Sequence, residues 1–403
     1  MNLRLARYID RWLGLGLCFV LWGLARLLAG GRMVPALFAT TPPRGEALAP
    51  KRVLAIKFYG LGNIAMILPT LAAMKEPDEE VEVDFLTLPG NVSLLKQSGL
   101  VTRCLTVEVS GFVGFVRSAV ALIVGLRQRR YDAVLDFEQF MKLSSIFAFL
   151  TGAPARVGFN TDGQARGWLY SHRVAYADTD HMADIFMRLN LPFGRCVQPA
   201  PQVRLAVSDA DRGRALEAAG VGEGEELVAM HIGTGPNYGK VALKRWGVER
   251  FAELADHLIR TRGVRVVFTG VGREEAELVG QALAHMKLRK NARSLCDGLT
   301  VSELTGLLDS CRFVVSNDTS VLHLTGLVQT PVVAIFGPTE PRLYGPRGSD
   351  SIVFYRSLFC SPCLSNYNLK MSRCVDPVCM KQVGFEEVAA AVDEHFPIAA
   401  RAV

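Results

Sequence analysis

Two glycine-rich segments each follow an apolar run and contain residues that could hold an anion. The first segment, residues 59–69 (YGLGNIAMILP), includes Gly60, Gly62 and Asn63 and fits the G-x-G-x-x-A spacing of dinucleotide sites. The second, residues 231–251 (HIGTGPNYGKVALKRWGVERF), includes Thr234 and Lys244. A glycine turn before a helix brings backbone N–H groups toward an anion, and a lysine neutralises its charge. Both segments therefore predict a phosphate-bearing ligand; a plain tight turn and a surface loop are the alternatives.

A third segment, residues 315–327 (VSNDTSVLHLTGL), places Asp318, Thr319 and Ser320 between an apolar run and a helical pattern. Open α/β sheets bind ligands at this position, the carboxyl end of a strand. We expect the hydroxyls and the helix amides to hold phosphate and Asp318 to hold sugar hydroxyls, with ordinary N-capping as the alternative. His323, one turn later, is either a catalytic residue or a buried core histidine. Residues 332–346 then predict a strand and a loop, with Thr339, that floors the site.

Alternating strand and helix patterns position these segments. In the first half we expect strands at 52–58, 81–88, 101–109 and 131–138 and helices at 112–130 and 141–150, with a turn at 152–159. In the second half we expect strands at 227–233, 264–270, 312–318 and 331–338, separated by helices. The predicted fold class is α/β, with two Rossmann-like domains facing across a cleft, an architecture called GT-B in sugar transferases. The expected divisions are an arm and linker at 1–50, domains at 51–205 and 206–350, and a tail at 351–403.

The positive charge is concentrated at the start of the chain. Residues 1–52 hold eight basic and two acidic groups, so the net charge of +6 belongs to this arm and the remainder is balanced. A balanced body argues against a nucleic-acid partner, and a basic arm suits an anionic membrane surface. The apolar stretch 12–31 predicts a membrane-associated helix, either spanning the bilayer or lying in its interface. A cleaved signal peptide and a helix docked on the protein itself are the alternatives.

The ordered segments together resemble glycosyltransferase family 9, the ADP-heptose:lipopolysaccharide heptosyltransferases. The similarity rests on residues 57–69, Lys244-Arg245-Trp246, residues 316–323 (SNDTSVLH) and residues 332–341 (VVAIFGPTEP). It implies a GT-B fold, an ADP-heptose donor, and inverting transfer that needs no metal or other cofactor. It also implies a lipid-linked saccharide acceptor and a location at the cytoplasmic face of the inner membrane.

The resemblance also suggests roles for individual residues. Lys244 matches the family's phosphate-binding lysine and Asp318 its donor-sugar aspartate, while Glu274 or Glu275 would meet the ribose. The family usually has GLGD at 60–63, where this chain has Asn63, and an amide cannot act as the base that the aspartate provides. We therefore expect Asp136 or Glu138 to substitute. The full set of expected donor-binding residues is Gly62, Thr234, Lys244, Glu274, Asp318, Thr319, Ser320 and His323.

Nine cysteines are present, and four of them cluster after residue 355. Cys360, Cys363, Cys374 and Cys379 follow a C-x2-C-x10-C-x4-C pattern that could form a structural four-thiolate metal site. Two disulfides, a reduced cluster or a redox pair are the alternatives.

Two other functions remain open on the sequence. Asn63 raises the hypothesis of a membrane-tethered, catalytically silent protein that binds a sugar nucleotide. The G-x-G-x-x-A spacing alone would also suit an NAD-dependent dehydrogenase. In that case Glu82 or Asp84 would have to bind the ribose, although both lie inside an expected strand.

Overall fold

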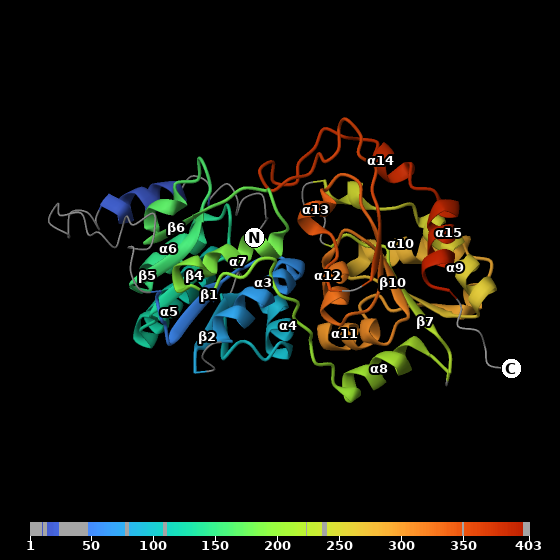
Figure 1. Cartoon of the computed structure of the whole chain (residues 1–403), viewed down its shortest axis with the longest axis horizontal. Helices are drawn as coiled ribbons and strands as arrows, with labels where there is room; N and C mark the ends of the chain where they lie inside the picture. Colours follow the sequence, from blue (N-terminus) through green and yellow to red (C-terminus); the bar gives the residue numbers. More distant parts are fainter. Residues whose placement is uncertain are drawn as a thin grey trace. The chain divides into compact units, whose positions relative to one another are not determined.

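The computed structural model describes residues 10, 14–23, 47–76, 80–107, 111–222, 224–235, 240–348 and 350–397; the side chains of 111–113, 115 and 116 are outside this description. The chain divides into two compact units, residues 1–203 and 204–403 (Figure 1). Each unit is described by itself below.

The first unit is built on a six-stranded sheet in the order β3-β2-β1-β4-β5-β6. Every neighbouring pair of strands is parallel. The strands are β1 (Arg52–Ile56), β2 (Glu82–Thr87), β3 (Arg103–Thr106), β4 (Ala133–Asp136), β5 (Ala155–Asn160) and β6 (His172–Ala175). Central strands such as β4 are buried on both faces, which is why they read as continuous apolar runs. The order reverses between β1 and β4, so their carboxyl ends form the ligand-binding position of this sheet type.

Helices cover both faces of this sheet. The chain moves from β1 outward to β3 and then back through β4 to β6, and right-handed crossovers put the helices of these two halves on opposite faces. The helices are α3 (Leu61–Lys75), α4 (Val92–Gln97), α5 (Gly111–Arg129), α6 (Lys142–Leu150) and α7 (Met182–Met187), with 3-10 turns η1 (Pro89–Asn91), η2 (Arg166–Leu169) and η3 (Arg188–Phe193). Consequently α5 and α6 share one face.

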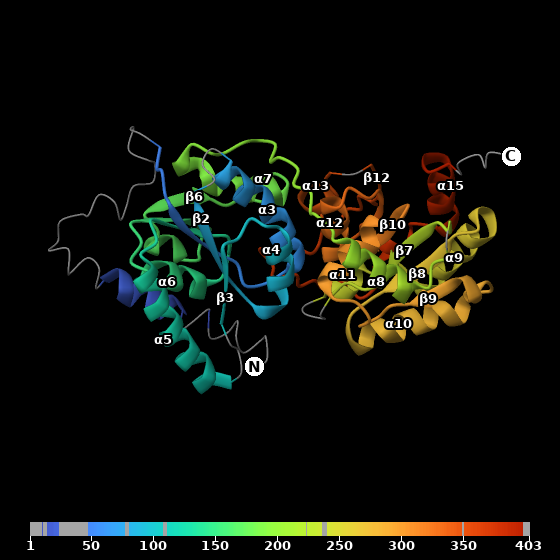
Figure 2. The same cartoon turned by 90° about the horizontal axis from the view of Figure 1, so that it is seen from below.

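A helix at residues 14–23, called here the N-terminal helix, packs beside α6 and η2 (Figures 1 and 2). Cys18 is buried with Ile146 and Leu169, and the Trp22 and Trp168 rings lie 5.6 Å apart. Asp10 accepts hydrogen bonds from the backbone N–H groups of Lys142 and Leu143 at the start of α6. Most of the expected arm lies outside the described residues, and no helix within them is long and apolar enough to cross a bilayer.

The second unit repeats the doubly wound pattern in the order β12-β11-β10-β7-β8-β9, again with parallel neighbours. Its strands are β7 (Leu227–His231), β8 (Arg265–Thr269), β9 (Ala292–Ser294), β10 (Phe313–Asn317), β11 (Val332–Ile335) and β12 (Ser351–Phe354). The order reverses between β7 and β10, so the ligand-binding position of this sheet lies at their carboxyl ends.

The helices of the second unit pack around one large apolar core. They are α8 (Asp209–Ala219), α9 (Val248–Arg262), α10 (Gly272–His285), α11 (Val301–Asp309), α12 (Ser320–Leu327), α13 (Pro341–Tyr344), α14 (Val378–Lys381) and α15 (Phe385–His395), with turns η4 (Val241–Lys244) and η5 (Arg289–Asn291). Residues after 350 belong to this unit: β12 extends the sheet, and α15 packs on α9.

The expected turn at 152–159 is wrong, because residues from Ala155 onward form β5. Glycine and proline at its start masked a short strand that β4 and β6 pair on both sides. The other expected elements exist, and most differ by one to three residues at their ends, where the boundaries of an element are least well defined.

Candidate functional site

Lys244 and Asp318 meet at the carboxyl ends of β7 and β10. Lys244 Nζ lies 2.6 Å from the Asp318 backbone oxygen and 3.2 Å from its Oδ2 atom. The Thr339 hydroxyl donates to the same Oδ2 at 2.7 Å. Burial alone would raise the pKa of Asp318, but the Lys244 ammonium and the Thr339 hydroxyl hold that pKa below its ordinary value. The site therefore pairs an ionised carboxylate with an ammonium at the edge where such sheets bind ligands.

Asn317, the residue before Asp318, connects the segments that carry this pair. It is fully buried; its Oδ1 accepts the Trp246 backbone N–H at 3.0 Å, and its Nδ2 donates to the Ile232 backbone oxygen at 2.8 Å. The Trp246 indole is anchored in turn by a bond from Nε1 to the Val383 oxygen. Lys244 is thus two residues from a buried aromatic anchor, which restricts where its ammonium can lie.

Thr319 and Ser320 open α12, as expected from the sequence. The Thr319 hydroxyl accepts the Val321 N–H at 3.2 Å, so it acts as the N-cap. Ser320 and His323 are half-buried on the first turn of this helix, and His323 is close enough to help lower the pKa of Asp318. Capping and ligand binding are compatible at this position, because a cap fixes the direction of the remaining helix amides.

The two neighbouring glutamates that the sequence left undecided have different surroundings. Glu275 is buried, and its carboxylate accepts three backbone N–H groups, from Thr234, Gly235 and Val271. A Cβ at Gly233 would lie 2.0 Å from its Oε1 atom, so this loop requires a glycine there. Glu275 therefore shapes the loop, which favours Glu274 as the ribose-binding residue.

Glu274 is about half exposed and pairs with Arg245 at 2.8 Å. Arg245 Nε also donates to the Thr234 hydroxyl at 3.2 Å, so Thr234, Glu274 and Arg245 form one connected edge of the site. Residues 236–239 of the glycine-rich loop lie outside the described residues. The sequence assigned no binding role of its own to Arg245, although this residue directly follows Lys244 in the Lys244-Arg245-Trp246 segment.

In the first unit, the Gly60 turn follows β1 and starts α3. Gly60 has φ +94°, in the region that favours glycine, and a Cβ there would lie 2.7 Å from Asn63 Nδ2. The Asn63 amide bends back over this turn, with Nδ2 3.4 Å from the Tyr59 backbone oxygen. Gly62 is buried in the first turn of the helix. Asn63 lies in the first turn of α3, shortly after β1, and offers an amide and not a carboxylate there.

Asp136 and Glu138 lie at the adjacent end of β4, in different environments. Asp136 is fully buried; its Oδ2 accepts from Arg166 at 2.8 Å and from the Tyr170 hydroxyl at 2.6 Å. Burial raises the pKa of Tyr170 well above its usual value, so this phenol stays protonated and donates. Asp136 is thereby committed to an internal network, and an acceptor hydroxyl could not reach it.

Glu138 retains slight exposure, 8% of its side chain. Lys57 Nζ donates to its Oε2 at 2.9 Å, and the Phe58 backbone N–H donates to its Oε1 at 2.9 Å. Between the two substitutes for the missing aspartate, the geometry favours Glu138.

The four tail cysteines are unpaired thiols within the second unit. The Ser372 hydroxyl donates to Cys363 Sγ at 3.3 Å. Burial raises the pKa of the Cys379 thiol, and the charges of Cys363, Cys374 and Cys360 raise it further, so the four thiols lie near one another. Over the described part of the chain, no three His, Cys, Asp or Glu side chains are grouped to hold a metal ion. The structural metal site suggested by the spacing of the cysteines stays a prediction. The expectation of metal-independent transfer concerns the reaction and stays a prediction.

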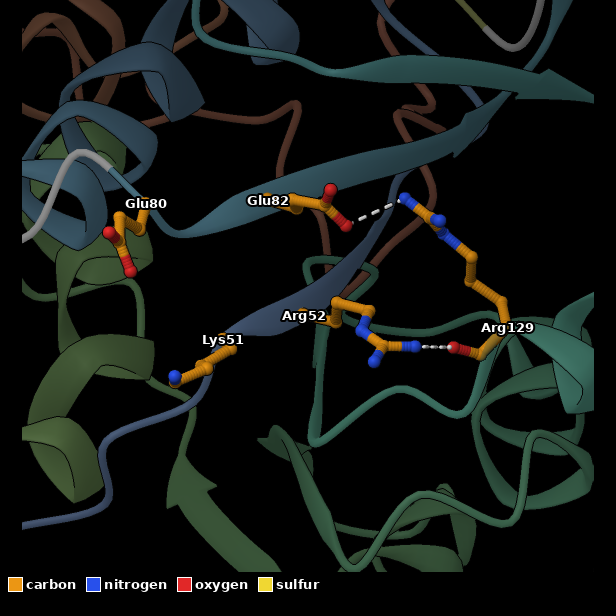
Figure 3. A pocket seen from close by; sticks show the side chains of 5 residues that line it. All are labelled: Lys51, Arg52, Glu80, Glu82 and Arg129. Atoms are coloured by element: carbon orange, nitrogen blue, oxygen red, sulfur yellow. Dashed lines mark hydrogen bonds and ion pairs between the residues drawn. The ribbon is translucent and has the colours of Figure 1, made fainter.

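A shallow hollow of about 450 Å³ lies at the amino ends of β1 and β2, lined by Lys51, Arg52, Glu80, Glu82 and Arg129 (Figure 3). Arg129 binds Glu82 at 2.8 Å, and Arg52 donates to the Arg129 backbone oxygen. Asp84 accepts from Arg129 and from the Tyr131 hydroxyl. Both acids that an NAD site would need are thus engaged away from the Gly60 turn, which weakens the dehydrogenase alternative.

Two doubly wound units, each with polar side chains at its order reversal, define the GT-B class of sugar transferases. A model of glycosyltransferase family 9 (heptosyltransferase) matches residues 119–371, more than half of the chain. The chain belongs to this family.

Curated relatives are heptosyltransferases. Lipopolysaccharide heptosyltransferase 2 of Escherichia coli K12 is 27% identical over 231 residues, covering 55% of this chain and 64% of the relative, just under two thirds of its length. Lipopolysaccharide heptosyltransferase 1 of the same strain is 23% identical over 313 residues, covering 75% of this chain and 92% of the relative.

Solved structures share the fold. The E. coli ADP-heptose heptosyltransferase II superposes with a TM-score of 0.69 at 19% identity, covering 85% of this chain and 98% of that one. A family 9 glycosyltransferase from Veillonella parvula superposes with a TM-score of 0.71 at 19% identity, covering 85% and 96%.

Proposed function

We propose that this protein transfers a heptose from ADP-heptose to a lipopolysaccharide-core or other cell-envelope saccharide. The observation that carries the proposal is the Lys244–Asp318–Thr339 arrangement at the β7/β10 reversal in a member of family 9. One solved neighbour, the E. coli heptosyltransferase WaaC at 18% identity, is described with ADP-2-deoxy-2-fluoro heptose. The proposed donor follows from this neighbour, and the proposed acceptor follows from the lipopolysaccharide heptosyltransferases among the relatives.

Roles for the residues follow from their chemistry. Lys244 and the positive end of α12 would neutralise the diphosphate as it leaves, when its charge increases. Asp318, ionised and fixed by Thr339, would accept hydrogen bonds from the hydroxyls of the sugar. Glu274 and Thr234 would contact the nucleoside. Direct attack of an acceptor oxygen on the anomeric carbon inverts its configuration and requires no metal when lysine and helix amides hold the phosphates.

The acceptor hydroxyl must lose its proton, and Glu138 is the proposed base. A carboxylate within hydrogen-bond reach of the hydroxyl would take the proton as the new bond forms. The test compares Glu138→Gln with Asn63→Asp in a transfer assay with ADP-heptose. We expect Glu138→Gln to lose about 100-fold or more in turnover, the contribution typical of a general base, while retaining ADP binding. Full activity of Glu138→Gln would remove this role.

A catalytically silent sugar-nucleotide binder is the second candidate, favoured by Asn63 alone. It predicts ADP-sugar binding without turnover on any acceptor preparation. If Asn63→Asp then creates turnover, the natural protein is a binder that lost its base. Calorimetric titration with ADP, UDP, GDP and NAD addresses the ligand separately; tight binding of NAD alone would contradict both candidates.

A further inference from the structure

The outer surface of the N-terminal helix is apolar and largely exposed in the described structure. Its inner stripe, which includes Gly14 and Cys18, packs against α6 and η2. Its outer stripe consists of Leu15, Gly16, Leu17, Phe19 and Val20, with Phe19 58% exposed and Val20 53% exposed. A surface helix in water ordinarily has a polar outer face. An apolar outer face marks an interaction surface.

The neighbouring α5 extends this surface on the same face of the sheet. Val120 and Val124, one turn apart, are 58% and 51% exposed, while Leu122 and Ile123 pack inward on the core. Trp168 of η2 is also partly exposed, beside Trp22 and Phe19. Figure 2 shows the N-terminal helix, α6 and α5 in one part of the first unit. We call the exposed side of these three helices the apolar face.

The charged side chains on the helices of the apolar face have one sign. The N-terminal helix (14–23), α5 and α6 contain no aspartate or glutamate, whereas α5 carries Arg117 and Arg127 on its exposed side. Asp10 is the nearest acid before the N-terminal helix, and its carboxylate accepts hydrogen bonds from the first two backbone N–H groups of α6. In the sequence, residues 1–52 contain eight basic and two acidic groups, most of which lie outside the described residues. An apolar surface whose own helices carry basic and no acidic side chains complements an anionic lipid surface.

We propose that the first unit docks on an anionic bilayer through the apolar face, with the N-terminal helix lying in the plane of the interface. Residues 14–23 span only about 15 Å as a helix, half the hydrocarbon thickness of a bilayer. Because one side of this helix is bound to α6, only its outer side can enter lipid. The proposal concerns the membrane surface and does not depend on which sugar the second unit binds.

The test measures flotation of the full-length protein with vesicles of phosphatidylethanolamine and phosphatidylglycerol, and with vesicles of phosphatidylcholine. The variant Leu17→Glu/Val20→Glu should bind the anionic vesicles at least about 100-fold more weakly, since each lost apolar insertion costs about tenfold. The matched control is Leu191→Glu/Val197→Glu. These side chains are 53% and 50% exposed, against 50% and 53% for the test pair. Leu191 belongs to η3 and Val197 to the loop after it, so neither is part of the three helices of the apolar face.

A second variant tests the charges. Arg117→Gln/Arg127→Gln should weaken binding to anionic vesicles about fivefold per arginine and leave the weak binding to phosphatidylcholine unchanged. Circular dichroism and thermal unfolding establish that each variant is folded. A control pair that detaches the protein as strongly as the test pair, or a test pair that floats like wild type, overturns the proposal.

Sedimentation without lipid tests whether a second copy of the chain, and not a membrane, binds the apolar face. If the apolar face instead binds a second copy of the chain, the wild type forms a dimer that Leu17→Glu/Val20→Glu dissociates, and this result also overturns the proposal. A wild-type monomer that floats with anionic vesicles supports it. Measuring ADP binding in the same variants separates the two proposals. A variant that loses flotation but keeps its ADP affinity has lost the docking surface, while its nucleotide site is intact.

Discussion

Replacing Lys244 and Asp318 singly and together separates their role in stability from their role in ligand binding. In the structure, the described acceptors of the Lys244 ammonium are two atoms of Asp318, at 2.6 and 3.2 Å. The Lys244 side chain is 13% exposed and that of Asp318 is 8% exposed, so each charge is largely removed from water. The informative variants are Lys244→Met, Asp318→Asn and the double substitution.

The stability effect can be estimated from burial. Removing one partner of a fully buried pair costs about 3–5 kcal/mol, because the other charge is left uncompensated. Asp318 keeps the hydrogen bond from Thr339 in Lys244→Met, and the site is partly open to water. We therefore expect Lys244→Met to lower the free energy of unfolding by about 2–3 kcal/mol. Two neutral residues leave no buried charge, so the double variant should recover to within about 1 kcal/mol of wild type.

Ligand binding should behave differently. A hydrogen bond to a charged group contributes about 1.5–3 kcal/mol, so losing the Lys244 ammonium should weaken ADP binding by about 10- to 150-fold. The double variant cannot restore that ammonium, and its ADP affinity should stay as low as that of Lys244→Met. Urea unfolding gives the stability, and calorimetric titration with ADP gives the affinity. Recovery of stability without recovery of affinity is the expected signature.

The control is the ion pair between Arg212 and Asp309, which joins α8 to α11 away from the site at 2.7 Å. Arg212→Met/Asp309→Asn should leave ADP affinity unchanged. The reasoning is refuted if the Lys244→Met/Asp318→Asn protein is folded and binds ADP as tightly as wild type, since Lys244 would then serve only to neutralise Asp318.

Two further predictions concern the glycine turn and a buried histidine. Gly60→Ala should destabilise the first unit by about 2–3 kcal/mol, because φ +94° is strained for alanine and the Cβ would crowd Asn63. The control Gly90→Ala has open space around its Cβ and should cost far less; urea titration measures both. Burial lowers the pKa of His231 below its usual 6.5. The unfolded chain therefore takes up a proton first, and stability should fall below pH 6.5 by up to about 1.4 kcal/mol per pH unit until the folded pKa is reached. Urea unfolding at pH 7.5 and 5.5 should show a smaller loss in His231→Gln, and identical losses would contradict this.

The sequence predicted the elements of the second unit well because their apolar runs are long and uniform. The strands around 227–231 and 313–317 are buried on both sides, and a helix (α9 or α12) separates each of them from the following strand. Prediction failed at 155–160, where a short strand follows glycine and proline. Such a strand is stabilised by its neighbours β4 and β6, and that information is not contained in its own residues.

For the site, local motifs identified the residues, but only the structure identified their partners. Lys244 and Asp318 were expected to bind one ligand, and the structure places them in contact across 74 residues of sequence. The function of Asn317 as a link to Trp246, and that of Arg166 as the partner of Asp136, depends on contacts between segments far apart in the chain. No spacing rule could have predicted these contacts, because a side-chain amide or guanidinium reads as polar wherever it occurs.

The two sheets place a lysine and a carboxylate at the same topological position, and the difference between the pairs explains how their functions differ. Lys57 follows β1 and binds Glu138 after β4; Lys244 binds Asp318 after β10, beside β7. An ammonium has three donors. Lys57 is buried and has three acceptors within 3.4 Å, on Glu138, Gln139 and Phe137, so its capacity is used within the protein. Among the described residues, Lys244 has hydrogen-bond acceptors on Asp318 alone, and its side chain is more exposed than that of Lys57. With two of its three donors engaged, Lys244 would have a donor left for the diphosphate of the proposed donor, whereas recruiting Lys57 would strip Glu138 of its counter-ion.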